Sequence, residues 1–215
     1  MPRKNIKLLG GLPLLSYSIA TCLKCVNIDR VIVSTEDEEI ANISRTFGAE
    51  VPFIRPLEFA RDDSPDYGVI KHFFSQVDAE EVVLIRPTTP LRDDAVVDTA
   101  IAIYRSLVDI TSMRSMHELA ESPYKFFKID SNGLCEGFFD NFNGIKNYTN
   151  LPRQTFPKAY HPNGYVDIIK RTTVDAGSTY GEKISPFFTD AVVEVDTKEQ
   201  FDLLELYLTR AETRA

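Results

Sequence analysis

Strand-like and helix-like segments alternate along the first two thirds of this 215-residue chain. The apolar run Val82-Val83-Leu84-Ile85 is the clearest buried strand, and Val31-Ile32-Val33-Ser34 is a second, shorter one. Apolar periodicity predicts helices at about 13–25, 64–77 and 93–107. Strands that alternate with helices form a parallel sheet covered by helices on both faces. The sequence therefore predicts the α/β class, with a mostly parallel sheet.

From about residue 110 this alternation stops. Residues 110–170 hold short strand-like pieces, turn signals such as Ser131-Asn132-Gly133 and many aromatic side chains. Because the segment is too apolar to stay solvated as a linker, we expect an excursion at about 120–160 that packs on something. It is either a dimerisation arm or a flap over its own domain. A last strand at about 191–195 and an amphipathic helix from about 198 complete the fold.

Three short patterns predict where helices begin. Thr35-Glu36-Asp37-Glu38 and Thr197-Lys198-Glu199-Gln200 have the spacing of capping boxes, in which the first and fourth side chains satisfy the helix's free N–H groups. Ser64-Pro65 matches an N-cap followed by proline at the first helical position.

The length of the chain fits a single domain, residues 1–215. Its net charge of −8 makes it a poor candidate for a nucleic-acid binder, which needs a concentrated basic face. No run approaches the roughly 18 apolar residues that span a bilayer, so no membrane partner is expected. Without a basic-then-apolar leader at its start, the chain is expected in the cytoplasm.

Cysteine usage fits a reducing compartment. Cys22 and Cys25 have the C-x-x-C spacing of a redox or zinc motif, but Cys135 stands alone and no second pair is present. Leu14, Leu15, Ser18, Ile19, Cys22 and Leu23 fall on one face of the predicted helix. We therefore expect these two thiols to be buried in the core.

Polar residues gather where the predicted strands end, which is where open α/β sheets bind their ligands. The segment Arg86-Pro87-Thr88-Thr89-Pro90-Leu91-Arg92 follows the clearest strand. Its two prolines fix two hydroxyls and two guanidinium groups at that edge. This pattern favours a binding loop, although a rigid connection in which Thr89 or Asp93 only caps the next helix is the alternative.

Glu194 and Asp196 stand two residues apart on the last predicted strand, so both carboxylates point to the same side. Mg²⁺ is a hard cation that one or two carboxylates and substrate phosphates typically hold. The alternative is that Asp196 only favours the dipole at the start of the final helix.

Two further clusters could contact a ligand. Arg3-Lys4-Asn5 offers a point charge for phosphate and an amide, although many basic N-termini have no such role. Leu151-Pro152-Arg153-Gln154 and His161-Pro162-Asn163-Gly164 suit a carboxylated, polyhydroxylated sugar, because a guanidinium fork matches a carboxylate. His161 is as well explained by a half-buried, hydrogen-bonded histidine.

Taken together, these elements resemble the acylneuraminate cytidylyltransferases, the CMP-sialic acid synthetase family, over the whole chain. The start of the chain is similar to that family's P-R-K-N run, and the loop at 86–92 to its Q-P-T-S-P-L-R element. Residues 152–164 are similar to its P-R-Q and R-P-N-G pair, and residues 194–197 to its D-I-D-T metal motif.

The resemblance implies a Rossmann-like fold of the nucleotide-diphospho-sugar transferase type, with a dimerisation arm and a homodimer. It implies transfer of CMP from CTP to a nine-carbon 2-keto sugar acid, with release of pyrophosphate. The implied site comprises Lys4, Arg92 and Asp196 for catalysis, Glu194 and Asp196 for Mg²⁺, and Asn5, Arg86, Thr88, Thr89, Arg153, Gln154, His161 and Asn163 for the substrates.

This chain departs from the family pattern in ways that leave alternatives open. Arg86 replaces Gln, His161 replaces Arg and Glu194 replaces Asp, and the first two lean toward legionaminate or a related nonulosonic acid. The 3-deoxy-octulosonate branch fits less well, because it typically reads P-G-K-P where this chain has Pro-Arg-Lys-Asn.

The family also places a buried strand and a glycine-rich loop, A-R-G-G-S-K-G, before its P-R-K-N run. Only Met1 stands there in this sequence. A non-catalytic homologue that binds sugar or dimerises is therefore a second hypothesis. We also expect exposed apolar faces and free strand edges beside the position of that strand.

Overall fold

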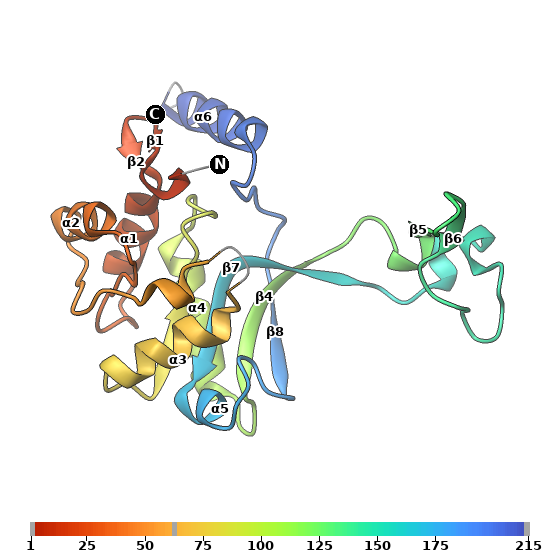
Figure 1. Ribbon diagram of the computed structural model, residues 1–215, viewed down its shortest axis with the longest axis horizontal. Coiled ribbons are helices and arrows are strands. Elements are labelled where there is room, and N and C mark those ends of the chain that lie inside the picture. Colours follow the sequence, from red (N-terminus) through yellow and green to blue (C-terminus); the bar gives the residue numbers. More distant parts are fainter. Residues whose placement is uncertain (1–2, 62–63, 213–215) are drawn as a thin grey trace.

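The computed structural model describes residues 3–61 and 64–212. Met1 and Pro2 of the first motif lie outside these residues. Figure 1 shows a body of helices and sheet, from which a long arm extends to one side. The α-helices are α1 (Leu14–Lys24), α2 (Glu38–Thr46), α3 (Asp66–Gln76), α4 (Asp94–Ser106), α5 (Arg171–Asp175) and α6 (Lys198–Glu212). No helix among the described residues is both long and apolar enough to cross a membrane.

Helix positions agree with the predictions to within a few residues, but two of the predicted caps are wrong. The cap of α2 is Asp37, whose carboxylate accepts hydrogen bonds from the N–H groups of Glu39 and Ile40, so no box begins at Thr35. Pro65 is the N-cap residue of α3, and no side chain among the described residues caps this helix by a hydrogen bond. The box at the start of α6 is confirmed by reciprocal hydrogen bonds between Thr197 and Gln200.

The central sheet has the order β3-β7-β4-β8. Its strands are β3 (Glu81–Leu84), β4 (Ser112–Glu118), β7 (Tyr160–Lys170) and β8 (Ile184–Phe188). β7 runs antiparallel to both β3 and β4, whereas β4 and β8 are parallel. The sheet is therefore mixed rather than mostly parallel. The reason is the arm: the chain leaves the body at the end of β4 and returns along the same path as β7 (Figure 1).

Helices cover both faces of this sheet, as the α/β class requires. Ile168 of β7 packs in one core cluster with Val97 and Ile101 of α4. Its neighbour Ile169 packs in another cluster with Ile70 of α3, together with Phe74. Because consecutive side chains of a strand point to opposite faces, α4 and α3 lie on opposite sides of the sheet.

Two of the predicted strands form no ladder with any other part of the chain that the structure describes. Within the segment 31–34, Ile32 makes an isolated bridge with Glu50. The segment 191–195 is extended without a strand partner, although the Val195 N–H donates a 2.7 Å hydrogen bond to the carbonyl of Thr88. Near the N-terminus, β1 (Leu8–Leu9) and β2 (Leu12–Pro13) form a small hairpin.

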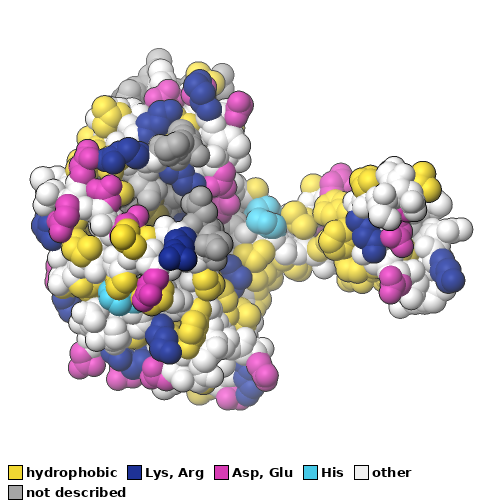
Figure 2. Space-filling view, viewed as in Figure 1, with side chains coloured by type: hydrophobic (Ala, Val, Ile, Leu, Met, Phe, Trp, Pro, Cys, Tyr) yellow, Lys and Arg dark blue, Asp and Glu magenta, His cyan; other side chains and the backbone are white. Residues whose placement is uncertain are grey.

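The arm carries its own small aromatic core. Antiparallel strands β5 (Phe127–Ile129) and β6 (Cys135–Gly137) form a hairpin, and the rings of Tyr124 and Phe156 stack with centroids 5.1 Å apart. Figure 2 shows hydrophobic side chains, in yellow, on the surface of the arm. The large apolar side chains that remain exposed there include Phe126, Phe127, Ile129, Leu134 and Phe138. The arm extends away from the body (Figure 1) and does not close over it as a flap.

Short 3₁₀ turns complete the fold. They are η1 (Lys4–Ile6), η2 (Leu57–Phe59), η3 (Pro123–Lys125), η4 (Tyr148–Asn150) and η5 (Arg153–Thr155). The prediction for the paired cysteines is confirmed, because Cys22 and Cys25 are both buried and free. Burial raises the pKa of the Cys22 thiol to about 11, so this thiol stays protonated at neutral pH.

Candidate active site

A cleft of about 300 Å³ lies where the loop after β3, the strand β7 and the segment before α6 meet. Four separate parts of the chain contribute to its wall: Arg86 and Thr88, Arg114, Pro162 and Gly164, and Glu194 and Asp196. The structure thus brings the motif loop after β3 and the two carboxylates of the last motif into one space. Such volumes are at the lower end of those found for small-molecule sites.

Lys4 joins this cleft through Asp196. Its Nζ lies 2.8 Å from Asp196 Oδ1, and the Lys4 side chain is half-buried. A lysine at this position can exchange its carboxylate partner for a phosphate oxygen without moving far. Asn5, the next residue, lines a different cleft, and its side-chain Oδ1 is buried without a hydrogen-bond partner among the described residues.

Backbone contacts fix the two carboxylates of the last motif. The fully buried side chain of Val195 anchors the segment between Glu194 and Asp196, and its N–H bonds the carbonyl of Thr88. The N–H groups of Asp196 and Thr197 both donate to the side-chain oxygen of Gln200, at 2.8 and 2.9 Å. Both carboxylates are therefore held at the cleft although they belong to no strand.

Gly164 allows β7 to approach Glu194 closely. Its φ of +61° is a conformation that residues with a Cβ rarely adopt. A Cβ at this position would also lie 2.9 Å from Glu194 Oε1 and 3.6 Å from Arg86 Cδ. The glycine of the predicted motif thus has a steric role in shaping the cleft.

Arg86 lies in a network of acidic groups. Its Nη1 donates to Asp167 Oδ2 at 2.8 Å, and its Nη2 donates to Asp66 Oδ2 at 2.6 Å and to the Tyr180 hydroxyl at 3.3 Å. Burial alone would lower the pKa of Arg86, but the hydrogen bond and charge of Asp167 more than reverse this, so the pKa lies above its ordinary value. With these acceptors in place, Arg86 has little capacity left for a substrate.

Arg92, predicted as catalytic, lies beneath the cleft and does not line it. Its guanidinium donates to the carbonyls of Tyr165 at 2.6 Å, Arg86 at 2.7 Å and Gly164 at 2.9 Å, and to Ser18 Oγ at 2.9 Å. Burial lowers its pKa to about 10, which still leaves it charged at neutral pH. This geometry favours a structural role for Arg92, holding together the backbone around the cleft.

Thr88 and Thr89 have different environments. Thr88 lines the cleft. Thr89 is buried, and its hydroxyl has no hydrogen-bond partner among the described residues. Asp93 caps α4 by accepting a hydrogen bond from the Ala95 N–H. The loop therefore does both things that the sequence left as alternatives: it lines the cleft and it caps the next helix.

The remaining predicted substrate residues do not line the cleft, although Pro162 and Gly164, on either side of Asn163, do. Asn163 is buried, with its amide donating to Thr189 Oγ1 at 2.6 Å. The ring of His161 faces that of His117 across β4 and β7, with centroids 5.7 Å apart. Arg153 and Gln154 belong to η5 in the arm, where Arg153 donates to the carbonyl of Ala120. Within one chain, none of these four residues lines the cleft that the two carboxylates share.

The donors present at the cleft suit a hard cation. Among the described residues, no group of three or more His, Cys, Asp or Glu side chains could hold a metal ion by itself. The cleft instead offers two carboxylates, Glu194 and Asp196, one oxygen of which is paired with Lys4. Mg²⁺ commonly binds through one or two carboxylates plus substrate phosphates, so this donor set fits the predicted ion.

Sequence reasoning missed Arg114, Asp167, Asp66 and Tyr180, which surround Arg86. A signal was available for one of them. Asp167 interrupts the apolar run of β7, and the structure shows it fully buried. Because a buried carboxylate is almost always paired with a cation, a charge inside an apolar strand predicts a basic partner on a neighbouring strand.

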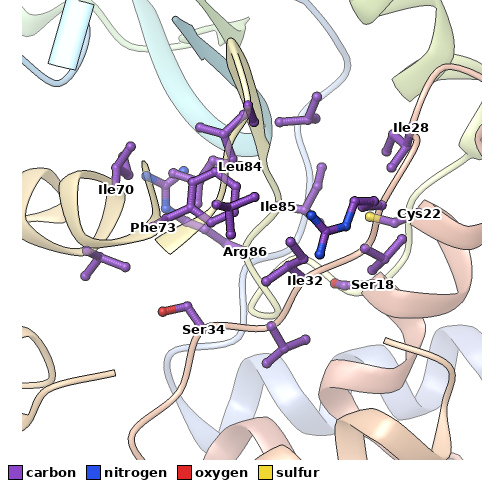
Figure 3. A pocket seen from close by; sticks show the side chains of 18 of the residues that line it. Ser18, Cys22, Ile28, Ile32, Ser34, Ile70, Phe73, Leu84, Ile85 and Arg86 are labelled. Atoms are coloured by element: carbon purple, nitrogen blue, oxygen red, sulfur yellow. The ribbon is translucent and has the colours of Figure 1, made fainter. Parts of the chain in front are cut away.

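A second, larger cleft of about 710 Å³ lies between the 31–34 segment and β3. Figure 3 shows that its side chains are largely apolar, among them Ile32, Ile70 and Ile85, with Arg86 and Ser34 adding polar groups. Among the described residues, each flanking element has a partner on one side only, since β3 pairs with β7 and Ile32 with Glu50. This agrees with the expected free strand edges. Carboxylates also line this cleft, among them Glu36, Asp66 and Glu81.

Comparisons with known proteins agree with the motifs. Residues 1–129 match the family model described as "Cytidylyltransferase". The chain is 28% identical over 208 residues to N-acylneuraminate cytidylyltransferase of Escherichia coli O18:K1:H7, covering 96% of this chain and 48% of that protein. It is 27% identical over 215 residues to CMP-N,N'-diacetyllegionaminic acid synthase of Legionella pneumophila, covering 95% of this chain and 89% of that protein.

The chain thus spans about half the length of the Escherichia coli relative and most of the Legionella one. Among solved structures, it resembles CMP:2-keto-3-deoxy-manno-octonic acid synthetase complexed with CTP, with a TM-score of 0.72 at 15% identity. That likeness covers 98% of this chain and 93% of the other. At this identity it establishes the shared fold, and the α/β class is confirmed.

Proposed function

The chain belongs to the cytidylyltransferase family, and on this premise we propose that it transfers CMP from CTP to a nonulosonic acid, a nine-carbon 2-keto sugar acid. The observation that carries the proposal is the shared cleft. There Lys4, Glu194 and Asp196, from opposite ends of the sequence, meet the loop after β3. Cations beside carboxylates suit a nucleoside triphosphate, whose phosphates need charge neutralisation.

In the proposed reaction the anomeric hydroxyl of the sugar acid attacks the α-phosphorus of CTP. A new O–P bond forms, and the bond between the α-phosphorus and the bridging oxygen breaks. Its electron pair leaves with pyrophosphate, and the hydroxyl proton passes to water. Positioning and electrostatic stabilisation supply most of the acceleration in this class of reaction.

Each residue of the cleft has a task in this proposal. Lys4 binds a phosphate oxygen, and Asp196 keeps its ammonium group at the cleft in the absence of nucleotide. Glu194 and Asp196 would hold Mg²⁺, which when bound neutralises phosphate charge. Arg92 keeps the carbonyls of Arg86 and Gly164 in place, so that the walls of the cleft stay at the right distance.

The arm supports a homodimer as part of the proposal. Its exposed apolar side chains extend into solvent, where large exposed apolar patches usually mark an interface. Arg153 and Gln154 are carried on the same arm, away from their own cleft. We expect sedimentation equilibrium to give twice the chain mass at micromolar concentration, and the Phe127→Asp variant to shift the mass toward one chain. A wild-type chain that stays monomeric there contradicts the dimer.

The choice of sugar acid rests on the sequence and on the comparisons. Arg86 and His161 depart from the sialic-acid pattern, and the Legionella relative, of nearly the same length, is named for diacetyllegionaminic acid. We therefore favour a legionaminate-type acceptor over N-acetylneuraminate. For such an enzyme the cytoplasm, where CTP is made available, is the proposed location.

A pyrophosphate-release assay tests the proposed function. The chain is incubated with CTP, MgCl₂ and either N-acetylneuraminate or N,N'-diacetyllegionaminate, and the CMP-sugar is identified by mass spectrometry. We expect pyrophosphate and CMP-sugar in equal amounts, with the faster rate on the legionaminate. ATP in place of CTP is the matched control and should give no product. If CTP releases no pyrophosphate with either acid, the enzyme assignment is contradicted and the non-catalytic alternative is favoured.

A further inference from the structure

Arg114 lines the catalytic cleft, yet the proposed reaction gives it no role. It lies on β4 directly across from Asp167 of β7, so the two side chains share one face of the sheet. The Arg114 side chain is 24% exposed, and its Nε is buried without a hydrogen-bond partner among the described residues. A cation in this position has lost much of its hydration and needs an acceptor.

Two contacts fix the orientation of this guanidinium. Its central carbon lies 4.0 Å from the centre of the Tyr180 ring, which is cation–π distance. Its Nε lies 3.5 Å from Asp167 Oδ1, close enough for an ion pair but too long for a good hydrogen bond. Among the described residues, no hydrogen bond involves its two terminal nitrogens. The donors of Arg114 are therefore held in place without an acceptor of their own.

Arg86, the other arginine of the cleft, is in the opposite state. Its terminal nitrogens already donate to Asp167, Asp66 and Tyr180. The fully buried Asp167 thus provides one negative charge for two guanidinium groups, and its Oδ2 accepts hydrogen bonds from Arg86 and Tyr180 but none from Arg114. An anion that enters the cleft finds its free guanidinium donors on Arg114.

The groups around the cleft indicate different binding positions for a phosphate and for a carboxylate. Glu194 and Asp196 repel a phosphate unless a cation stands between. Lys4 and the proposed Mg²⁺ supply such cations beside these carboxylates, so the phosphates of the nucleotide belong on that side of the cleft. Arg114 comes from β4 and rests on the Asp167–Tyr180 cluster. A guanidinium fork with two free donors matches a carboxylate bidentately.

We propose that Arg114 binds the carboxylate of the sugar acid and determines that this enzyme accepts an acid rather than a neutral sugar. The inference rests on the proposed function for the identity of the ligand. Asp167 acts as a positioning residue: it fixes both arginines, whereas only Arg114 touches the substrate.

The test compares an acid with its neutral analogue. Isothermal titration measures binding of N,N'-diacetyllegionaminate and of its C1 amide to the wild-type chain and to Arg114→Gln and Arg114→Lys. A charge-assisted bidentate contact corresponds to roughly a 10- to 100-fold preference for the acid. Arg114→Gln should reduce this preference to about 1- to 3-fold, and Arg114→Lys should retain part of it. If Arg114 had a merely structural role, its replacement would weaken the binding of both ligands equally.

Arg105→Gln is the matched control, because Arg105 is exposed on α4 and pairs with Glu81 away from the cleft. It should keep the wild-type preference. A preference that survives in Arg114→Gln, or a wild-type chain that binds neither ligand, overturns the inference. The test is independent of turnover: discrimination lost in Arg114→Gln without pyrophosphate release supports Arg114 and sinks the proposed reaction. Turnover with discrimination unchanged does the reverse.

Discussion

Replacing Arg92 with methionine is expected to lower the free energy of unfolding by about 2–4 kcal/mol. The Arg92 guanidinium donates four hydrogen bonds, to three carbonyls and to Ser18 Oγ, at 2.6–2.9 Å. These acceptors belong to α1, to the loop after β3 and to β7. Methionine fills much of the volume but leaves the carbonyls without donors, and unsatisfied buried groups cost about 1–3 kcal/mol each.

Urea denaturation measures this change, with Arg105→Met as the matched control. Arg105 also pairs with a carboxylate, that of Glu81 at 2.7 Å, but its side chain is 44% exposed. An exposed ion pair contributes about 0–1 kcal/mol, so the control should differ little from the wild type. A loss below 1 kcal/mol in Arg92→Met would show that water replaces the guanidinium, and that Arg92 is free for another role.

This role for Arg92 illustrates what the sequence could predict and what it could not. Its place in the motif loop could be predicted, because the apolar run before it and the prolines around it are local signals. The acceptors of its hydrogen bonds could not be predicted, because Ser18 lies 74 positions away in the sequence and Gly164 lies 72 away. A motif identifies residues that belong together without distinguishing those that touch a ligand from those that support the backbone.

The same limit applies to the sheet. Helices α1, α3 and α4 follow from periodicity within ten to fifteen residues. The direction of β7 does not, because it depends on the chain returning along its outward path after the arm, and no local pattern in the arm sequence indicates that return. Leu84 and Arg114 both pair with Asp167, and no local pattern connects these three positions.

Replacing Asp196 with asparagine should reduce kcat/KM for CMP transfer by at least about 100-fold with little change in stability. The side chain of Asp196 is 60% exposed, so its charge contributes little to folding. The N–H groups that anchor the segment, those of Val195, Asp196 and Thr197, do not involve this carboxylate. Asparagine keeps the shape but removes the negative charge that both Lys4 and Mg²⁺ would use.

Asp202→Asn is the matched control for this variant. Asp202 lies on α6, has a comparable exposure of 49% and also pairs with a lysine, the Nζ of Lys198, at 2.7 Å. Its replacement removes the same charge from the same region of the chain without touching the cleft, so kcat/KM should stay within about twofold of the wild type. If the kcat/KM of Asp196→Asn also stays within about twofold of the wild type, then Asp196 only favours the start of α6. If both lose activity equally, the effect comes from the net charge of the region. A selective loss in Asp196→Asn that higher Mg²⁺ partly restores would connect this carboxylate to the metal, because a weakened site fills again by mass action.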